Sequence, residues 1–185
     1  MRLGWDDGQR NAASLAAKAA ASGVRMITVH GRTRCQFYKG RADWKAIREV
    51  VQAVDISVIA NGDIIDVTSA KLALAQSGAA GVMVGRGSIG RPWVLADIAA
   101  GLRGKRPPRQ IAKKDIIDLI SDHYNAMLSF YGNHLGVRTA RKHLSSYLAH
   151  FDVPQAFRHA LLTQCDGTTV LRQIADLSQF EFRMQ

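Results

Sequence analysis

Two short apolar segments, each followed by a glycine-containing polar turn, constrain the fold of this chain more than any other feature. Residues 57–60 lead into a turn at 61–63, and residues 81–84 lead into a turn that begins at 85–87. Residues 67–76 between them have the apolar spacing that is typical of a helix. A strand, a crossover helix and a second strand form a parallel βαβ unit. The sequence therefore predicts a parallel sheet with both turns at one edge.

The residues of these two turns suit a phosphate group. Gly62 and Gly85 have no side chain, so the backbone there can approach a ligand closely. A helix that begins after the second strand would direct its amide groups at a bound anion. Arg86 adds a planar cation that can form two hydrogen bonds with a phosphate. We therefore expect a phosphate site at this edge of the sheet.

A further strand precedes this unit. Residues 24–29 are apolar and largely β-branched, as in a buried parallel strand, and they end at His30. Residues 1–7 resemble the end of another strand, and residues 43–54 predict a helix with Trp44 in the core. Strands alternating with helices indicate an open sheet or a (β/α)8 barrel, in which ligands bind at the carboxyl ends of the strands. At such an end, His30 is equally consistent with a ligand contact and with a strand cap.

An alanine-rich helix is expected over residues 8–22. Asp6 or Asp7 is placed to cap its first turn, and Gly23 is placed to end it.

A loop with cations and aromatic residues follows the strand that ends at His30. Such a mixture suits stacked bases and phosphates, although a solvated loop anchored by its aromatic residues has the same composition. The residues concerned are Arg32, Arg34, Phe37, Tyr38, Lys39 and Arg41.

The last third of the chain has a different pattern. Residues 103–113 are basic and contain prolines, and we interpret them as a linker. Residues 114–185 have helical periodicity and short connections, which predict a small antiparallel bundle. Arg138, Arg141 and Lys142 share one face of its second helix. Such a stripe is either a solvated face or a surface for RNA or DNA.

Charge and composition narrow the class of protein. The formal net charge of +10 and the pI of about 10.1 favour an anionic partner, with nucleic acid as the first candidate. The alternative is a soluble protein whose basic charge serves no binding partner. No apolar run is long enough to span a bilayer, and the polar N-terminus is unlike a signal peptide. Cys35 and Cys165 are far apart and lack metal-ligand spacing. We expect a cytoplasmic protein with no metal, disulfide or membrane segment.

Four motifs, in order, resemble the tRNA-dihydrouridine synthases, specifically the bacterial B-type branch. Residues 28–33 (Thr-Val-His-Gly-Arg-Thr), 59–64 (Ile-Ala-Asn-Gly-Asp-Ile) and 84–93 (from Val-Gly-Arg-Gly to Gly-Arg-Pro-Trp) are similar to the later strand ends of that family. Residues 136–143 (Gly-Val-Arg-Thr-Ala-Arg-Lys-His) are similar to its C-terminal RNA-binding bundle. The opening residues 1–5 resemble its fifth barrel strand, so the resemblance covers essentially the whole chain.

The resemblance implies an FMN-dependent enzyme that reduces uridine to 5,6-dihydrouridine in tRNA with NADPH as reductant. It implies a flavin contact for His30, a phosphate site at Gly85 and Arg86, and a substrate contact for Arg2. Residues along the flavin ribityl chain and phosphate would be Asn61, Gly62 and Asp63. Residues on the tRNA backbone would be Arg138, Arg141 and Lys142.

The departures from the family pattern affect the expected architecture. The first four barrel strands and the cysteine that acts as the family's general acid are missing, and neither Cys35 nor Cys165 matches that cysteine. We therefore expect the C-terminal half of a (β/α)8 barrel (strands 5–8) in residues 1–102, a linker at 103–113, and a tRNA-binding helical domain at 114–185. Such a half would be inactive alone and bind FMN weakly. It would form a homo-oligomer or bind the missing N-terminal half, because its strand edges are unpaired.

Two other functions remain open at this point. A non-catalytic module that binds RNA or DNA, with a regulatory role, would explain the missing cysteine but not the flavin-type residues. Another flavin barrel, of the dihydroorotate-oxidoreductase kind, would explain those residues but not the basic helical region.

Overall fold

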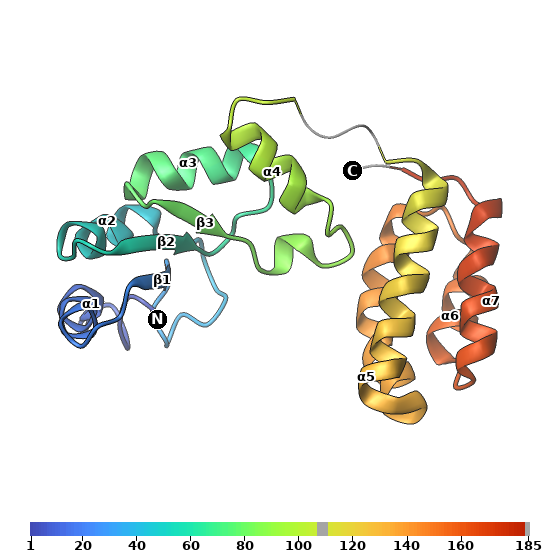
Figure 1. Cartoon of the computed structure of the whole chain (residues 1–185). Helices are drawn as coiled ribbons and strands as arrows, with labels where there is room; N and C mark the ends of the chain where they lie inside the picture. The colour runs from blue at the N-terminus through green and yellow to red at the C-terminus, as the bar shows by residue number, and fades with distance from the viewer. Residues whose placement is uncertain (107–110, 184–185) are drawn as a thin grey trace. The chain divides into compact units, whose positions relative to one another are not determined.

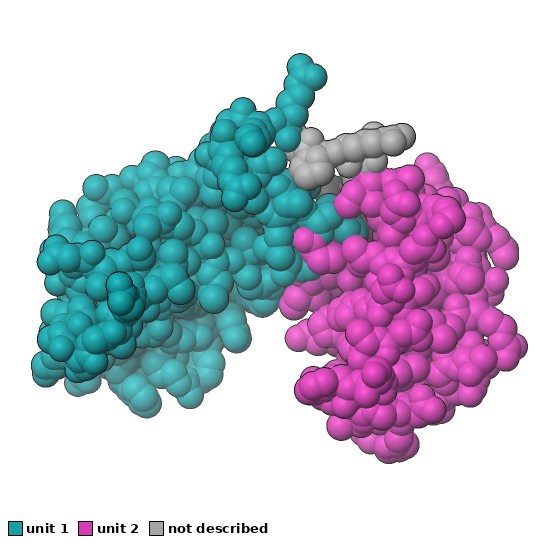
Figure 2. Space-filling view, in the orientation of Figure 1, with its two compact units in different colours: residues 1–88, 93–107 teal, residues 89–92, 108–185 magenta. Residues whose placement is uncertain are grey.

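The computed structural model describes residues 1–106 and 111–183, which fall into two units (Figure 2). Unit 1 consists of Met1–Ser88 and Trp93–Pro107, and unit 2 consists of Ile89–Pro92 and Pro108–Gln185. Residues 107–110 of the expected linker lie outside the described residues.

Unit 1 is built on a parallel sheet, as the sequence predicts. Its strands are hydrogen-bonded in the order β1-β2-β3. Their bounds are Met26–His30 for β1, Ser57–Asn61 for β2 and Gly81–Met83 for β3. The strands are paired so that His30 lies opposite Asn61 and Asn61 lies opposite Met83. The carboxyl ends of all three strands therefore meet at one edge.

The first residues run beside β1. The His30 amide donates to the Met1 carbonyl at 2.9 Å, the Leu3 amide donates to the Arg32 carbonyl at 3.1 Å, and Arg2 forms an isolated parallel bridge with His30. This confirms a short strand-like segment at the start of the chain.

The helices of unit 1 follow one another along the sheet in chain order (Figure 1), each in contact with the next. Helix α2 packs on β2, and α3 packs on β2 and β3. Their bounds are Ala12–Ala21 for α1, Trp44–Gln52 for α2, Val67–Ser77 for α3 and Val94–Leu102 for α4.

Helix α1 begins four residues later than predicted. The Asp6 carboxylate does not cap it but accepts from the amides of Gly8 and Gln9, at 2.9 Å each. This local turn competes with the helix for the same backbone groups. Asn11 stands at the helix start and makes no side-chain capping bond. The prediction that Asp6 or Asp7 caps a helix from residue 8 is wrong.

The sheet is buried on one face only. Ile27, Val29, Val58 and Ala60, which alternate along β1 and β2, are at most 6% exposed and pack under the helices. On the opposite face Met26 is 59% exposed and Met83 is 50% exposed. The expectation that β1 is buried like a strand of a closed parallel sheet is correct for one of its faces.

The segment after β3 differs from the expected helix. A three-residue 3-10 turn, η1 (Arg86–Ser88), follows the strand, and α4 begins only at Val94 with Trp93 before it. The helix therefore does not begin directly after the strand, and the backbone beside the predicted phosphate site is a turn.

Unit 2 is helical. Helix α5 (Lys113–Tyr147) is interrupted at Gly132, whose φ of 73° and ψ of 164° are accessible essentially only to glycine. The interruption separates the segment that carries Arg138 from the helical segment before it, in agreement with the prediction that Arg138 lies on the second helix of this region. The remaining elements are η2 (Leu148–His150), α6 (Gln155–Thr163), α7 (Gly167–Ala175) and η3 (Asp176–Gln179).

The helices of unit 2 share their own core. Helix α5 contacts α6 and α7, which also contact each other. Ile120, Tyr124, Leu161 and Ile174 are at most 1% exposed.

Within residues 1–106 and 111–183, no helix has both the length and the apolar composition needed to cross a membrane.

Candidate functional site

The ends of the three strands are linked by hydrogen bonds around Asn61. Its carbonyl accepts from the Gly31 amide at 2.9 Å, and its side-chain amide donates to the Met83 carbonyl at 2.8 Å. The structure thus brings His30, Asn61 and the segment that leads to Gly85 together at one edge, as the parallel topology predicts.

The turn after β2 is packed against the His30 ring. Gly62 has a φ of 111° and Asp63 a φ of 54°, and both lie in the left-handed region. A Cβ atom on Gly62 would lie 2.8 Å from the Ala42 Cβ and 3.0 Å from the His30 ring atoms Cδ2 and Nε2. Glycine is required here both for the backbone angle and for the close approach of the turn to the ring.

Asp63 is the centre of the polar contacts at this edge. Its carboxylate accepts two hydrogen bonds from the Arg32 guanidinium, at 2.9 and 2.6 Å, and a third from the Ala42 amide at 2.8 Å. Arg32 is only 1% exposed, although the sequence grouped it with the cations of a base-binding or solvated loop. That grouping is wrong, because the Arg32 guanidinium is used inside the protein.

Arg32 also fixes the loop that follows it. Its remaining donors reach the carbonyl of Lys39 at 3.1 Å and of Gly40 at 2.7 Å.

Burial alone would raise the pKa of Asp63, but the hydrogen bonds from Arg32 and the Ala42 amide hold that pKa below its usual value. Asp63 is therefore ionised at neutral pH and neutralises a buried cation.

The predicted phosphate residues lie next to this centre. The guanidinium of Arg86 lies 3.6 Å from the Asp63 carboxylate, and its side chain is 60% exposed. Among the described residues, apart from the immediate chain neighbours, no atom lies within 4 Å of the position that a Cβ on Gly85 would occupy. An exposed forked cation beside accessible backbone is suited to an anionic ligand.

Arg2 is held by the loop after β1. It donates to the carbonyls of Thr33 at 2.8 Å and Phe37 at 2.9 Å. The Tyr38 ring is close to two guanidinium groups, because its centroid lies 5.8 Å from the Cζ atom of Arg2 and 4.4 Å from the Cζ atom of Arg86. Tyr38 is a site residue that the sequence indicated only through the mixture of aromatic and cationic residues in this loop.

His30 combines burial with a positive surrounding. Burial lowers the pKa of its imidazole, and the charges of Arg2, Arg32 and Arg86 lower it further against the opposing effect of Asp63. The ring is therefore neutral at pH 7. Its Nδ1 atom is buried and has no hydrogen-bond partner among the described residues. An unsatisfied buried nitrogen of this kind fits a ligand that supplies the missing partner.

The cations predicted to bind RNA differ in their surroundings. Arg138 and Lys142 are exposed one turn apart on α5. Arg141 is partly buried, and its guanidinium donates to the carbonyls of Thr163 and Gln164, at 3.3 Å each. Arg141 thus connects α5 to the segment between α6 and α7.

The described residues contain no group of three or more His, Cys, Asp or Glu side chains that could hold a metal ion. Cys35 and Cys165 are free and exposed.

Comparisons with known proteins agree with the four sequence motifs. A model of the dihydrouridine synthase (Dus) family matches residues 1–180. A probable tRNA-dihydrouridine synthase of Rhodobacter capsulatus is 60% identical over 147 residues, which are 80% of this chain and 45% of the relative. A probable tRNA-dihydrouridine synthase of Rickettsia typhi is 49% identical over 178 residues, or 95% of this chain and 54% of the relative.

A tRNA-dihydrouridine synthase B of Vibrio cholerae is 40% identical over 157 residues, which are 85% of this chain and 49% of the relative. The chain spans about half the length of the curated relatives it matches. The family match nevertheless covers nearly all of its residues. This chain belongs to the dihydrouridine synthase (Dus) family.

Proposed function

We propose that this chain takes part in the flavin-dependent reduction of uridine to 5,6-dihydrouridine in tRNA, as the FMN-phosphate and tRNA-binding part of the enzyme. The observation that carries the proposal is the strand-end site, where exposed Arg86 and accessible Gly85 follow β3, and where the buried Nδ1 atom of His30 at the end of β1 lacks a hydrogen-bond partner among the described residues. Bound FMN would supply a hydride for the uracil ring, with NADPH as the reductant.

The residues of this chain would bind and orient the cofactor. Gly85 and Arg86 would hold its phosphate, and His30 and Asn61 would contact the remainder of the flavin. Asp63 would act as a positioning residue, because its carboxylate is occupied by Arg32, the Ala42 amide and Arg86. The turn at Gly62 would hold the His30 ring in place.

Arg2 is the proposed substrate contact. We assign no proton donor to this chain, and we propose that it is inactive without a complementary part. The (β/α)8 barrel, of which this sheet would be strands 5–8, belongs to the same proposal. The free, exposed cysteines favour a reducing compartment such as the cytoplasm.

Unit 2 would bind the tRNA backbone. Exposed Arg138 and Lys142 are available for phosphate contacts, which position an RNA without reading its sequence. Arg141 would support them mainly by fixing the segment around Thr163 and Gln164. A non-catalytic RNA-binding module is the second candidate, because unit 2 has its own core and a cationic helix.

Titration with FMN and with riboflavin separates these candidates. We expect weak binding of FMN, with a preference over riboflavin of about 10-fold, because charge-assisted hydrogen bonds to the phosphate contribute about 1.5–3 kcal/mol. Arg86→Gln should abolish the preference and leave riboflavin binding unchanged. Lys142→Ala, in unit 2, is the matched control. Equal affinities for FMN and riboflavin in the unaltered chain would contradict the flavin part of the proposal.

The open face of the sheet implies a covering surface. We propose that a second copy of the chain or a complementary half barrel covers the face that carries Met26 and Met83 and the unpaired edge of β3. Analytical ultracentrifugation should give an oligomer of the isolated chain, or a monomer that binds a hydrophobic dye strongly. A stable monomer with little dye binding would count against this proposal.

A further inference from the structure

Two exposed aromatic rings and a guanidinium form a cluster outside the strand-end site. Trp5 is 59% exposed and Phe37 is 52% exposed. The guanidinium carbon of Arg34 lies 5.9 Å from the centroid of the Trp5 ring and 4.3 Å from that of Phe37. We call Trp5, Arg34 and Phe37 the aromatic platform. Large aromatic side chains usually bury most of their surface. Solvent-exposed rings that are held by cation–π contacts therefore suggest a binding surface.

The backbone of the platform is fixed. The amides of Arg34 and Cys35 donate to the carbonyls of Gly4 and Trp5, at 2.8 Å each, so both sides of the platform are joined although they are distant in sequence. Arg2 binds the Phe37 carbonyl at 2.9 Å. Phe37 itself has a φ of 49°, a left-handed conformation that is uncommon for a residue other than glycine. A strained conformation maintained by surrounding hydrogen bonds is frequent at ligand-binding sites.

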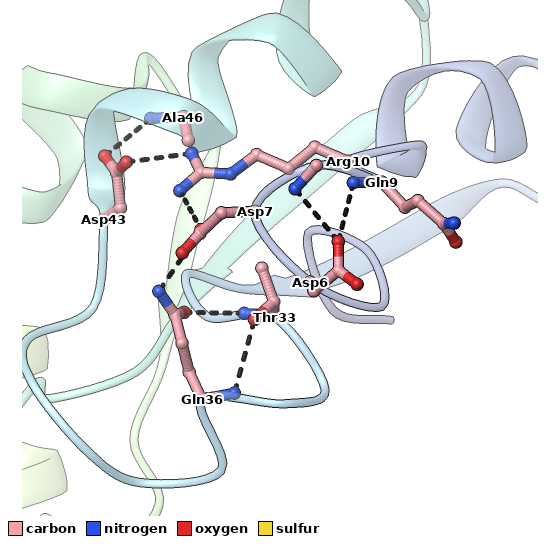
Figure 3. A network of polar contacts seen from close by, with 9 residues as sticks. Asp6, Asp7, Gln9, Arg10, Thr33, Gln36, Asp43 and Ala46 are labelled. Carbon is pink, nitrogen blue, oxygen red and sulfur yellow. Dashed lines mark hydrogen bonds and ion pairs between the residues drawn. The ribbon is translucent and has the colours of Figure 1, made fainter.

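A network of side chains supports the same loop (Figure 3). Gln36 accepts from the Thr33 amide at 2.8 Å and donates to Asp7 at 3.5 Å. Asp7 binds Arg10 at 2.7 Å, and Arg10 reaches Asp43 at 3.3 Å, which caps α2. The loop is thereby connected to the first residues of the chain and to a helix of the core. Such preorganisation reduces the entropy lost when a ligand binds.

The platform also continues into the strand-end site. Tyr38 follows Phe37 in the sequence, its ring makes cation–π contacts with Arg2 and Arg86, and Arg86 contacts Asp63. A ligand that occupies the strand-end site and extends along this loop would therefore reach the platform next.

We propose that the aromatic platform stacks an unpaired base of the RNA, a neighbour of the uridine that is reduced. This inference rests on the proposed function, which makes RNA the substrate. Every base has a flat π-face that can stack on an aromatic ring or on a guanidinium plane, whatever its sequence. The net charge of +10 attracts the phosphates, and the rings contact the base. The platform therefore takes single-stranded RNA and excludes a paired, stacked duplex.

Two substitutions remove the rings with little effect on folding. Trp5→Ala removes an exposed side chain, while the backbone hydrogen bonds of residue 5 remain. Phe37→Gly removes the ring at a φ that glycine adopts readily, so its melting temperature should stay the same or rise. Trp5→Phe keeps an aromatic ring. Phe130→Ala, at a ring 81% exposed on α5 of unit 2, is the matched control.

The probes are an oligouridylate of about eight nucleotides, within the site size of single-strand binding surfaces, and an abasic oligonucleotide of the same length. Fluorescence anisotropy of the labelled oligonucleotides with the full chain measures both affinities. Trp5→Ala and Phe37→Gly should each weaken binding of the oligouridylate about 10-fold, because stacking contributes about 1–3 kcal/mol per base. Binding of the abasic oligonucleotide should not change. Trp5→Phe and Phe130→Ala should bind both probes like the unaltered chain.

Other results overturn the inference in distinguishable ways. If Lys142→Ala weakens both probes but the platform substitutions weaken neither, the RNA-binding function stands and the platform has no part in it. If the platform substitutions weaken binding of both probes equally, the rings do not act by stacking on a base. If the unaltered chain binds neither probe, both this inference and the RNA part of the proposed function fail.

Discussion

Replacing Asp63 with asparagine is expected to lower the free energy of unfolding of unit 1 by about 3 kcal/mol. The substitution removes the charge that neutralises Arg32, whose side chain is 2% exposed and cannot reach water. The carbonyls of Lys39 and Gly40 remain as acceptors but carry no formal charge. An unpaired buried cation then destabilises the folded state.

Urea unfolding followed by tryptophan fluorescence measures this effect selectively. All three tryptophans, at positions 5, 44 and 93, belong to unit 1, so the signal reports on that unit. Asp7→Asn is the matched control, because it breaks a contact of 2.7 Å with Arg10 in which Asp7 is 68% exposed. Exposed pairs contribute less than about 1 kcal/mol. Equal losses in the two variants would refute the assignment of Asp63 as the centre of the site.

The same pair has a defined pH dependence. Because the pKa of Asp63 is lower in the folded protein, its contribution is complete above the usual carboxyl pKa and is lost as the pH falls through the folded-state pKa. The stability difference between the unaltered chain and Asp63→Asn should therefore shrink below about pH 4. A difference that grows as the pH falls would contradict this sign.

Gly62→Ala is the second large expected effect, a loss of about 3 kcal/mol in the free energy of unfolding of unit 1. The new methyl group would meet the Ala42 Cβ at 2.8 Å and the His30 ring at 3.0 Å, and the φ of 111° is unfavourable for alanine. Displacement of the turn should also disturb the His30 ring, and with it the flavin site.

Gly85→Ala provides the comparison for this prediction. Beyond its chain neighbours, no atom of the described residues lies within 4 Å of the new methyl group, so the free energy of unfolding should change by less than about 1 kcal/mol. Gly85→Ala should still weaken the binding of FMN, because the methyl group occupies space beside the accessible backbone. If Gly62→Ala were as stable as Gly85→Ala in urea, the close packing of the turn on His30 would not exist in solution.

The sequence predicted those features that depend on local pattern and on the rules for parallel sheets. The carboxyl ends of parallel strands share an edge, so the proximity of His30, Asn61 and the segment before Gly85 followed from the order of the elements. Trp44 packs against the core, as its helical position indicated, and donates to the Gly62 carbonyl at 2.8 Å. The interruption of α5 at Gly132 likewise has a local cause.

Contacts between distant residues were beyond prediction from local pattern. Arg32 and Asp63 are 31 residues apart, and nothing near Arg32 distinguishes it from the exposed Arg34. Arg141 has the helical spacing of a surface cation, yet it binds backbone carbonyls more than 20 residues away. The platform is also non-local, because the Trp5 ring comes near Arg34 only when the first residues run beside β1.

The amount of dihydrouridine in tRNA reports directly on the proposed reaction. Mass spectrometry of tRNA nucleosides would compare source cells that have the gene for this chain with cells in which it is deleted. We expect at least one dihydrouridine position to revert to uridine on deletion, to be restored by the unaltered gene, and not to be restored by the Arg86→Gln variant. Unchanged dihydrouridine at every position after deletion would contradict a role for this chain in uridine reduction.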